Sequence, residues 1–111
     1  MKREIKMISP LQKAKLMANW PFDDLTIKAP VRLYDATSSW QCYLLALNPV
    51  DEDEVRCLLQ PNEKMTAQIS IWSLKDISAC YNNLGEAPAI DLEYCPRYTD
   101  YLLKKLNENI T

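Results

Sequence analysis

Few residues in this chain can do chemistry, and their types exclude most catalytic machinery. The 111 residues contain no histidine, so the commonest general base at neutral pH and every Ser-His or Cys-His pair are missing. A single glycine, Gly85, excludes the glycine-rich loops that cradle phosphates. A pocket holding two of Asp35, Asp91 and Glu93 with raised pKa values would indicate carboxylate catalysis. The sequence contains no local motif that indicates such a site, so we predict a protein without catalytic residues.

Four cysteines are the remaining reactive groups, and they are widely spaced. None forms a C-x-x-C pair, and no histidine can complete a zinc site. We therefore expect no metal or cofactor and predict buried, reduced, structural thiols, while a disulfide, a metal ligand and a nucleophile stay open as alternatives. The N-terminus shows charges without an apolar core after them, so we expect no signal peptide and a cytoplasmic location. The four are Cys42, Cys57, Cys80 and Cys95.

The densest charged motif is an acidic run that follows Pro49. It has two interpretations: a solvated loop, or an acidic patch that engages Lys and Arg on a partner, such as a surface that normally binds nucleic acid. Calcium is a poor fit because the EF-hand spacing and its glycine are absent. The run consists of Asp51, Glu52, Asp53 and Glu54.

Three further residues have the types that anchor interfaces. Tyr34 shares a predicted strand face with Arg32, and Trp72 continues the outward face of another predicted strand. Exposed aromatic residues beside arginine are typical of protein-binding sites. The alternative is that helices cover these side chains. Together with the acidic run, these three residues are our candidate protein-interaction site.

The first half of the chain predicts one helix and two strands. Ser9 as N-cap and Pro10 in the first turn begin a helix that ends near Asn19. Extended segments follow over 27–35 and 40–47. The second is apolar on both faces, which is typical of a central strand covered on both sides. The helix is expected to face inward through Leu11, Ala14, Met17 and Ala18. The two strand faces are expected to be Trp40, Cys42, Leu44, Ala46 and Gln41, Tyr43, Leu45, Leu47.

The second half predicts strands over 55–60 and 65–71, the latter by clear alternation of apolar and polar residues. A helix then begins at Ser73 and is expected to end at Gly85. A short strand over 90–94 and a closing helix over 99–109 complete the series. The inward residues of the two helices are expected to be Leu74, Ile77, Tyr81 and Leu84, and Leu102, Leu103, Leu106 and Ile110.

These elements predict an α+β domain in which about three helices pack on an antiparallel meander sheet of four to five strands. Residues 1–8 are expected to be a ragged N-terminus and residues 9–111 a single domain. No apolar run approaches the roughly 20 residues of a membrane span, so we expect no membrane partner.

Three segments also carry a family pattern: PVRLYDATSSWQCYLLALNPVDEDEVRCLL, the SLKDI helix start and LGEAPAIDLEYCP. With them the chain, from about Leu11 to Leu103, resembles a small family of uncharacterised domains carried by plasmids, integrative elements and phages of bacteria. That family tends to be glycine-rich before its Ser-Leu helix, whereas residues 60–72 contain no glycine. The resemblance implies a mobile-element setting and brings no catalytic residues.

We therefore predict a non-enzymatic, protein-binding accessory factor of a mobile genetic element. Its specific form would be an inhibitor of a host defence system, of the anti-CRISPR or anti-restriction type, with a partner protein that presents a basic surface. The alternative is a nucleic-acid-associated regulatory protein, because the first 22 residues are basic while the remainder is acidic. In that case Lys13 and Lys15 on the first helix would contact the nucleic acid.

Overall fold

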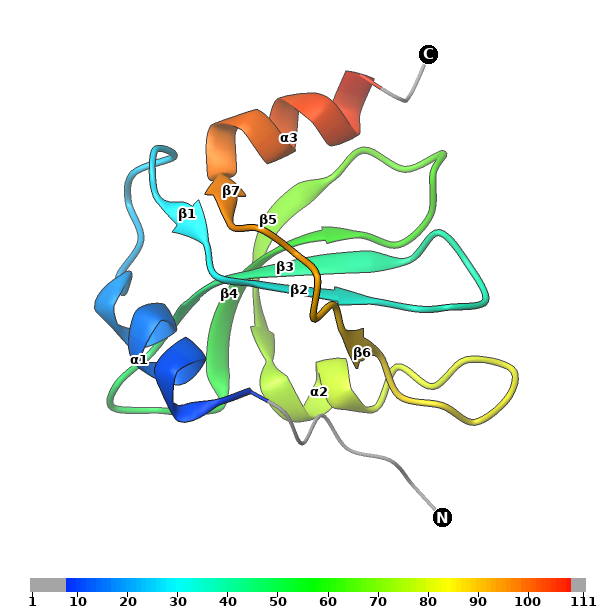
Figure 1. Cartoon of the computed structure of the whole chain (residues 1–111), viewed down its shortest axis with the longest axis horizontal. Coiled ribbons are helices and arrows are strands. Elements are labelled where there is room, and N and C mark those ends of the chain that lie inside the picture. The colour runs from blue at the N-terminus through cyan, green and yellow to red at the C-terminus, as the bar shows by residue number, and fades with distance from the viewer. Residues whose placement is uncertain (1–7, 109–111) are drawn as a thin grey trace.

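A curved five-stranded antiparallel sheet forms the centre of the molecule (Figure 1). The computed structural model describes residues 8–108, and residues 1–7 and 109–111 lie outside the described part. The strand order is β5-β4-β3-β2-β6, so four consecutive strands form the predicted meander and β6 is added beside β2. The predicted α+β class is confirmed. The strands are β2 (Val31–Tyr34), β3 (Gln41–Leu47), β4 (Glu54–Gln60), β5 (Gln68–Ser73) and β6 (Ala89–Ile90).

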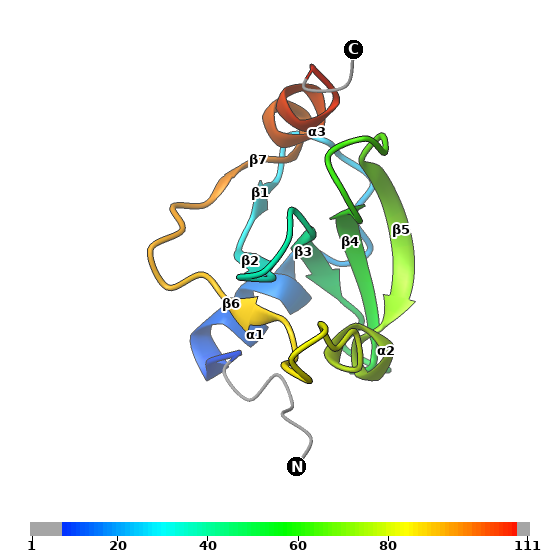
Figure 2. The ribbon, with the colours of Figure 1, turned by 90° about the vertical axis from the view of Figure 1, so that its right-hand side faces the viewer.

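Helices cover both faces of this sheet, as Figure 2 shows in side view. Leu16 of α1 (Pro10–Ala18) and Ile77 of α2 (Leu74–Ser78) pack in one core cluster. Leu102 and Leu106 of α3 (Thr99–Glu108) pack in a second cluster on the other face. A small two-stranded sheet, β1 (Lys28–Ala29) with β7 (Arg97–Tyr98), adjoins α3. Within residues 8–108 no helix has the length and apolar character needed to cross a membrane.

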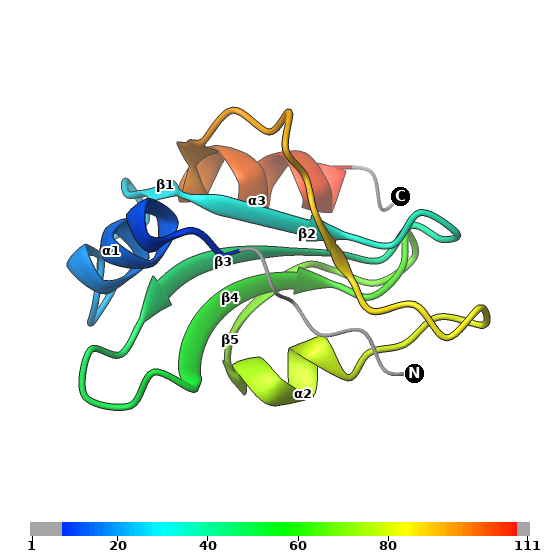
Figure 3. The same cartoon turned by 60° about the horizontal axis from the view of Figure 1, so that its bottom comes forward.

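Strand β3 is buried on both faces, which confirms its predicted central position. Its pairing with β4 shifts register between Leu44 and Ala46, which marks a β-bulge. The extra residue lets Leu45 and Ala46 both pack in the cluster beneath α3, and it returns Leu47 to the cluster of Leu44. The predicted alternation was therefore wrong beyond Leu45, because a bulge inverts the period of two. Figure 3 shows β3 between β2 and β4 in the sheet.

Helix α1 begins as predicted. The Ser9 hydroxyl accepts the Gln12 N–H at 3.1 Å and the Gln12 side chain accepts the Ser9 N–H at 2.9 Å, which is a complete capping box. The predicted inward stripe was wrong except for Met17, since Leu11, Ala14 and Ala18 are exposed and Leu16 is fully buried against the sheet. The helix is only nine residues long, so one large side chain, with Met17 beside it, suffices to dock it.

Helix α2 begins at Ser73 as predicted but ends at Ser78 rather than near Gly85. The Asn82 side-chain oxygen accepts the N–H groups of Leu84 and Glu86 at 2.9 and 3.0 Å. Such side-chain bonds to the local backbone compete with helical hydrogen bonds, so the chain forms a loop here. Gly85 lies inside this loop with φ of +75°, and Leu84, predicted to be buried, is exposed.

The predicted strand over 90–94 is reduced to β6, because Asp91 turns the chain. Its carboxylate accepts the Glu93 N–H at 3.0 Å, and Leu92, which was predicted to alternate inward, is exposed. The closing helix is confirmed as α3, with Leu102 and Leu106 inward. The expected inward Ile110 lies outside the described residues.

Candidate interaction site

The acidic run forms the turn between β3 and β4, and its third carboxylate organises the start of α2. Asp53 accepts the Ser73 hydroxyl at 2.6 Å and the Lys75 N–H at 3.0 Å, while its carbonyl accepts the Leu74 N–H at 2.7 Å. The Ser73 hydrogen bond, followed by the Lys75 backbone, lowers the pKa of the Asp53 carboxyl. Asp53 is therefore a structural capping group.

The other acidic residues also have partners within the chain. Glu52 forms an ion pair with Lys13 of α1 at 2.8 Å, and Glu54 accepts the Asn48 amide at 2.9 Å. Asp51 accepts the N–H of Asp53 at 3.1 Å. Asp51 and Glu52 stay exposed, but the run is not a set of four free carboxylates.

Arg32 and Tyr34 lie together on the α3 side of the sheet, as the shared strand face predicted. The Arg32 guanidinium lies 5.3 Å from the centre of the Tyr34 ring. It also forms an ion pair with Asp91 at 2.9 Å and donates to the Gln41 side chain at 3.3 Å. These contacts fix the guanidinium, which is about one-quarter exposed.

The sequence reasoning missed a polar network that extends from Arg32 across the sheet. Gln41 accepts the Tyr43 hydroxyl at 3.2 Å and donates to the Gln60 side chain at 3.1 Å. Gln60 is 3% exposed and donates to the Leu106 carbonyl at 3.3 Å. The sequence did contain a signal for this network, because Gln41 and Gln60 lie at the ends of two predicted strands that a hairpin would pair.

Trp72 is exposed on the other side of the molecule, so the predicted interaction residues do not form one surface. It lies opposite Val55, in the face that packs against α1 and α2, and β3 and β4 separate it from Arg32. Its neighbour Ile71 faces the α3 side. Trp72 is 38% exposed and Ile71 is 54% exposed, so an apolar side chain emerges on each face of β5.

The backbone of β5 has one paired and one open side. The Leu74 N–H bonds to the Asp53 carbonyl, one step beyond the last β4–β5 pair. Antiparallel ladders alternate, so every second residue of β5 directs its N–H and C=O away from β4. In residues 8–108 no strand pairs with that side (Figure 2). The residues whose backbone N–H and C=O groups point away from β4, here called outward, are Ile69, Ile71 and Ser73. We call the strand from Gln68 to Ser73 the edge surface.

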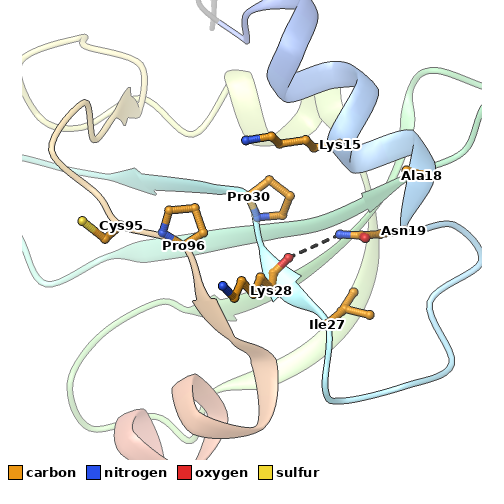
Figure 4. A pocket seen from close by; sticks show the side chains of 8 residues that line it. All are labelled: Lys15, Ala18, Asn19, Ile27, Lys28, Pro30, Cys95 and Pro96. Atoms are coloured by element: carbon orange, nitrogen blue, oxygen red, sulfur yellow. Dashed lines mark hydrogen bonds between the residues drawn. The ribbon is translucent and has the colours of Figure 1, made fainter.

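An open groove of about 510 Å³ lies on the opposite side of the sheet from β5, between α1, β1 and the segment that leads to β7 (Figure 4). Two lysines, Lys15 and Lys28, reach it from different elements, and prolines form part of its wall. The Lys28 ammonium also lies 5.2 Å from the centre of the Tyr98 ring. The lining residues are Lys15, Ala18, Asn19, Ile27, Lys28, Pro30, Cys95 and Pro96.

The cysteines divide into two buried and two exposed thiols. Cys42 and Cys57 are buried in the core, where a mutual hydrogen bond and burial raise the pKa of the Cys42 thiol. Cys80 and Cys95 are exposed, so the expectation of buried thiols was wrong for these two. Among residues 8–108 no cluster of three or more cysteine or carboxylate groups is placed to hold a metal ion.

Two of the three carboxylates considered for catalysis, Asp35 and Asp91, have structural partners. Asp35 accepts hydrogen bonds from Asn82 at 2.9 Å and from the Thr37 N–H and Ser38 hydroxyl at 3.0 and 2.8 Å. These bonds, the Asn82 contact above all, lower the pKa of Asp35 to about 2. Asp91 is paired with Arg32. The raised pKa that an acid catalyst needs is therefore not found at Asp35.

Comparison of the chain with known protein families, with curated proteins and with solved structures finds no match in any of the three. The resemblance to the mobile-element family therefore stays a prediction from the sequence.

Proposed function

We propose that the chain is a non-enzymatic protein-binding factor and that the edge surface is its binding site. The observation that carries this proposal is the open side of β5, where Ile71 and Trp72 are exposed beside outward backbone groups. An extended segment of a partner would hydrogen-bond to β5 and cover both side chains, which is the mode called β-strand addition. Trp is also among the residues that contribute most to interfaces.

The contrast between the two sheet edges supports this proposal. Exposed edges are usually blocked by charged residues, by proline or by being very short. Strand β6 is two residues long and directly follows Pro88. Strand β5, with the sequence QISIWS, is six residues long and contains no charge and no proline. One edge is thus protected against pairing, whereas the other has the properties of a binding edge.

The setting that we propose is a mobile genetic element, with a component of a host defence complex, of the CRISPR or restriction type, as the partner. The small size and the sequence resemblance support this setting. A partner with basic residues flanking its extended segment would fit best, because Asp53 bonds to Ser73 and so places the acidic turn at the end of β5.

Affinity capture from bacterial host lysate tests the binding site. We expect a recovered protein to be lost with Ile71→Lys, which places a charge on the edge surface, and to be retained with Leu92→Lys. Leu92 is an exposed leucine far from β5 in the fold, so it is a matched control. Equal recovery with both variants, or no change in phage plaquing or plasmid transfer on expression of the protein, would count against the proposal.

A second candidate function, binding of nucleic acid, is favoured by the groove that Lys15 and Lys28 share. The predicted contact Lys13 is already paired with Glu52, which weakens this reading. A nucleic-acid-binding function predicts salt-sensitive binding of DNA or RNA, with an affinity that decreases in the Lys15→Glu variant. No mobility shift at low salt would eliminate it.

A further inference from the structure

We infer that the strand which the edge surface fits is β5 of a second copy of this chain, paired antiparallel about a two-fold axis at Ile71. The inference rests on the proposed function, because it concerns the same surface: the second copy occupies the edge in the free protein, and a host partner would have to displace it. Pairing of this kind would join the two sheets into one, and it would leave the Arg32 and Tyr34 surface accessible on both copies.

Under this symmetry the outward N–H and C=O groups of one copy lie opposite the outward C=O and N–H groups of the other. Ile69, Ile71 and Ser73 point away from β4, and Ile71 is the middle one. About a two-fold axis the two Ile71 residues exchange N–H···O=C bonds, and each Ser73 N–H reaches the Ile69 carbonyl of the other copy. Every outward residue is used, and no register other than this one uses all of them symmetrically.

Neighbouring contacts stop the ladder at both ends of β5. The Ala67 N–H, the next outward donor, is already bonded to the Asn107 side chain at 2.8 Å. At the other end Ser73 is the N-cap of α2, so the chain leaves the sheet. A longer partner strand would gain no further bonds, whereas a second β5 has the required length.

The side chains also fit, because residues directly opposite one another share a face. Ile71 meets Ile71 on the α3 side, and Trp72 meets the small Ser70 on the other side. The pairing therefore covers the two apolar side chains that are 54% and 38% exposed in the single chain. It places a large ring beside a small residue rather than beside another ring.

Charge does not oppose self-pairing. A two-fold interface brings each surface against its own copy, so charged residues near the axis would repel their equivalents. Strand β5 contains no Lys, Arg, Asp or Glu. A surface that has to select a strongly charged segment would require complementary charges along its length, and β5 has none.

Sedimentation velocity over a range of concentrations tests for the dimer. We expect the wild-type chain and Leu92→Lys to dimerise and Ile71→Lys to stay monomeric, because two ammonium groups would meet at the axis. Circular dichroism confirms that each variant is folded. A wild-type chain that is monomeric at every concentration would overturn the inference, as would a dimer that Ile71→Lys leaves intact.

Cysteine crosslinking tests the register in a Cys80→Ser, Cys95→Ser background, which removes the exposed thiols. Opposite residues in a hydrogen-bonded pair have Cα atoms about 5.5 Å apart, within reach of a disulfide. Ile71→Cys should form a crosslinked dimer on oxidation and Ile69→Cys, which faces Ser73, should not. Equal crosslinking of both, or of neither, would refute this register. A monomer whose Ile71→Lys variant still loses a captured partner would refute self-pairing and leave the proposed function standing.

Discussion

Replacement of Gln60 by leucine tests the link between the sheet and α3. The Gln60 amide group donates to the Met65 and Leu106 carbonyls, both at 3.3 Å, and its oxygen accepts the Gln41 amide at 3.1 Å. Gln60→Leu keeps most of the side-chain volume and removes all three bonds. The variant therefore isolates the polar contribution to stability at a site that is 3% exposed.

The expected cost follows from these contacts. Each hydrogen bond contributes about 1 kcal/mol net, so three give about 3 kcal/mol. Burial of an apolar side chain in place of an amide returns roughly 1 kcal/mol. We therefore expect the free energy of unfolding to fall by about 2 kcal/mol, which corresponds to a decrease of about 10 °C in Tm for a domain of this size.

Urea denaturation followed by tryptophan fluorescence measures this difference, with Gln68→Ala as control. Gln68 is exposed in β5, so its truncation should change the free energy of unfolding by less than about 0.5 kcal/mol. An equally small change in Gln60→Leu would show that the Gln41–Gln60 network does not hold α3 against the sheet.

Two further predictions concern titratable groups. In native protein at neutral pH we expect a thiol reagent to modify Cys80 and Cys95 only, with Cys42 and Cys57 reacting after unfolding; four rapidly reacting thiols in the native state would contradict the packing. Because the native pKa of Asp35 is lowered from 3.8 to about 2, its stabilising contribution is present above the unfolded pKa and is lost as the pH falls through the native pKa. The free energy of unfolding should therefore decrease over that range in the wild type and less steeply in Asp35→Asn; parallel pH profiles would contradict the Asp35 assignment.

The sequence predicted those elements that depend on residues close to them in the chain. The serine caps of α1 and α2 act within a few residues, so they are visible in the sequence. The alternation over 65–71 predicted a strand, which forms as β5 over 68–73, but Met65 and Ile71 of its expected buried face are exposed. The bulge at Leu45 could not be predicted, because it depends on how β3 fits between two core clusters. A predicted helix and a predicted strand are shorter than expected because the side chains of Asn82 and Asp91 accept backbone N–H groups of following residues. Apolar periodicity does not reveal such bonds.

The candidate site was predicted in part. The contact of Arg32 with Tyr34 followed from their shared strand face, and the side chain of Trp72 was correctly predicted to be exposed. The internal role of Asp53 depends on Ser73, twenty positions away in sequence, and this contact exists only because β5 returns beside β4. The open edge follows from strand order, which a single sequence does not specify.

Backbone amide exchange in β5, measured by NMR, tests the binding edge most directly. In the unbound chain the inward amides of Ser70 and Trp72 should be protected and the outward amides of Ile69, Ile71 and Ser73 should exchange rapidly. When a partner or a second copy is bound, we expect these three outward amides to become protected as well. If binding occurs and the three continue to exchange rapidly, the edge of β5 is not the binding site.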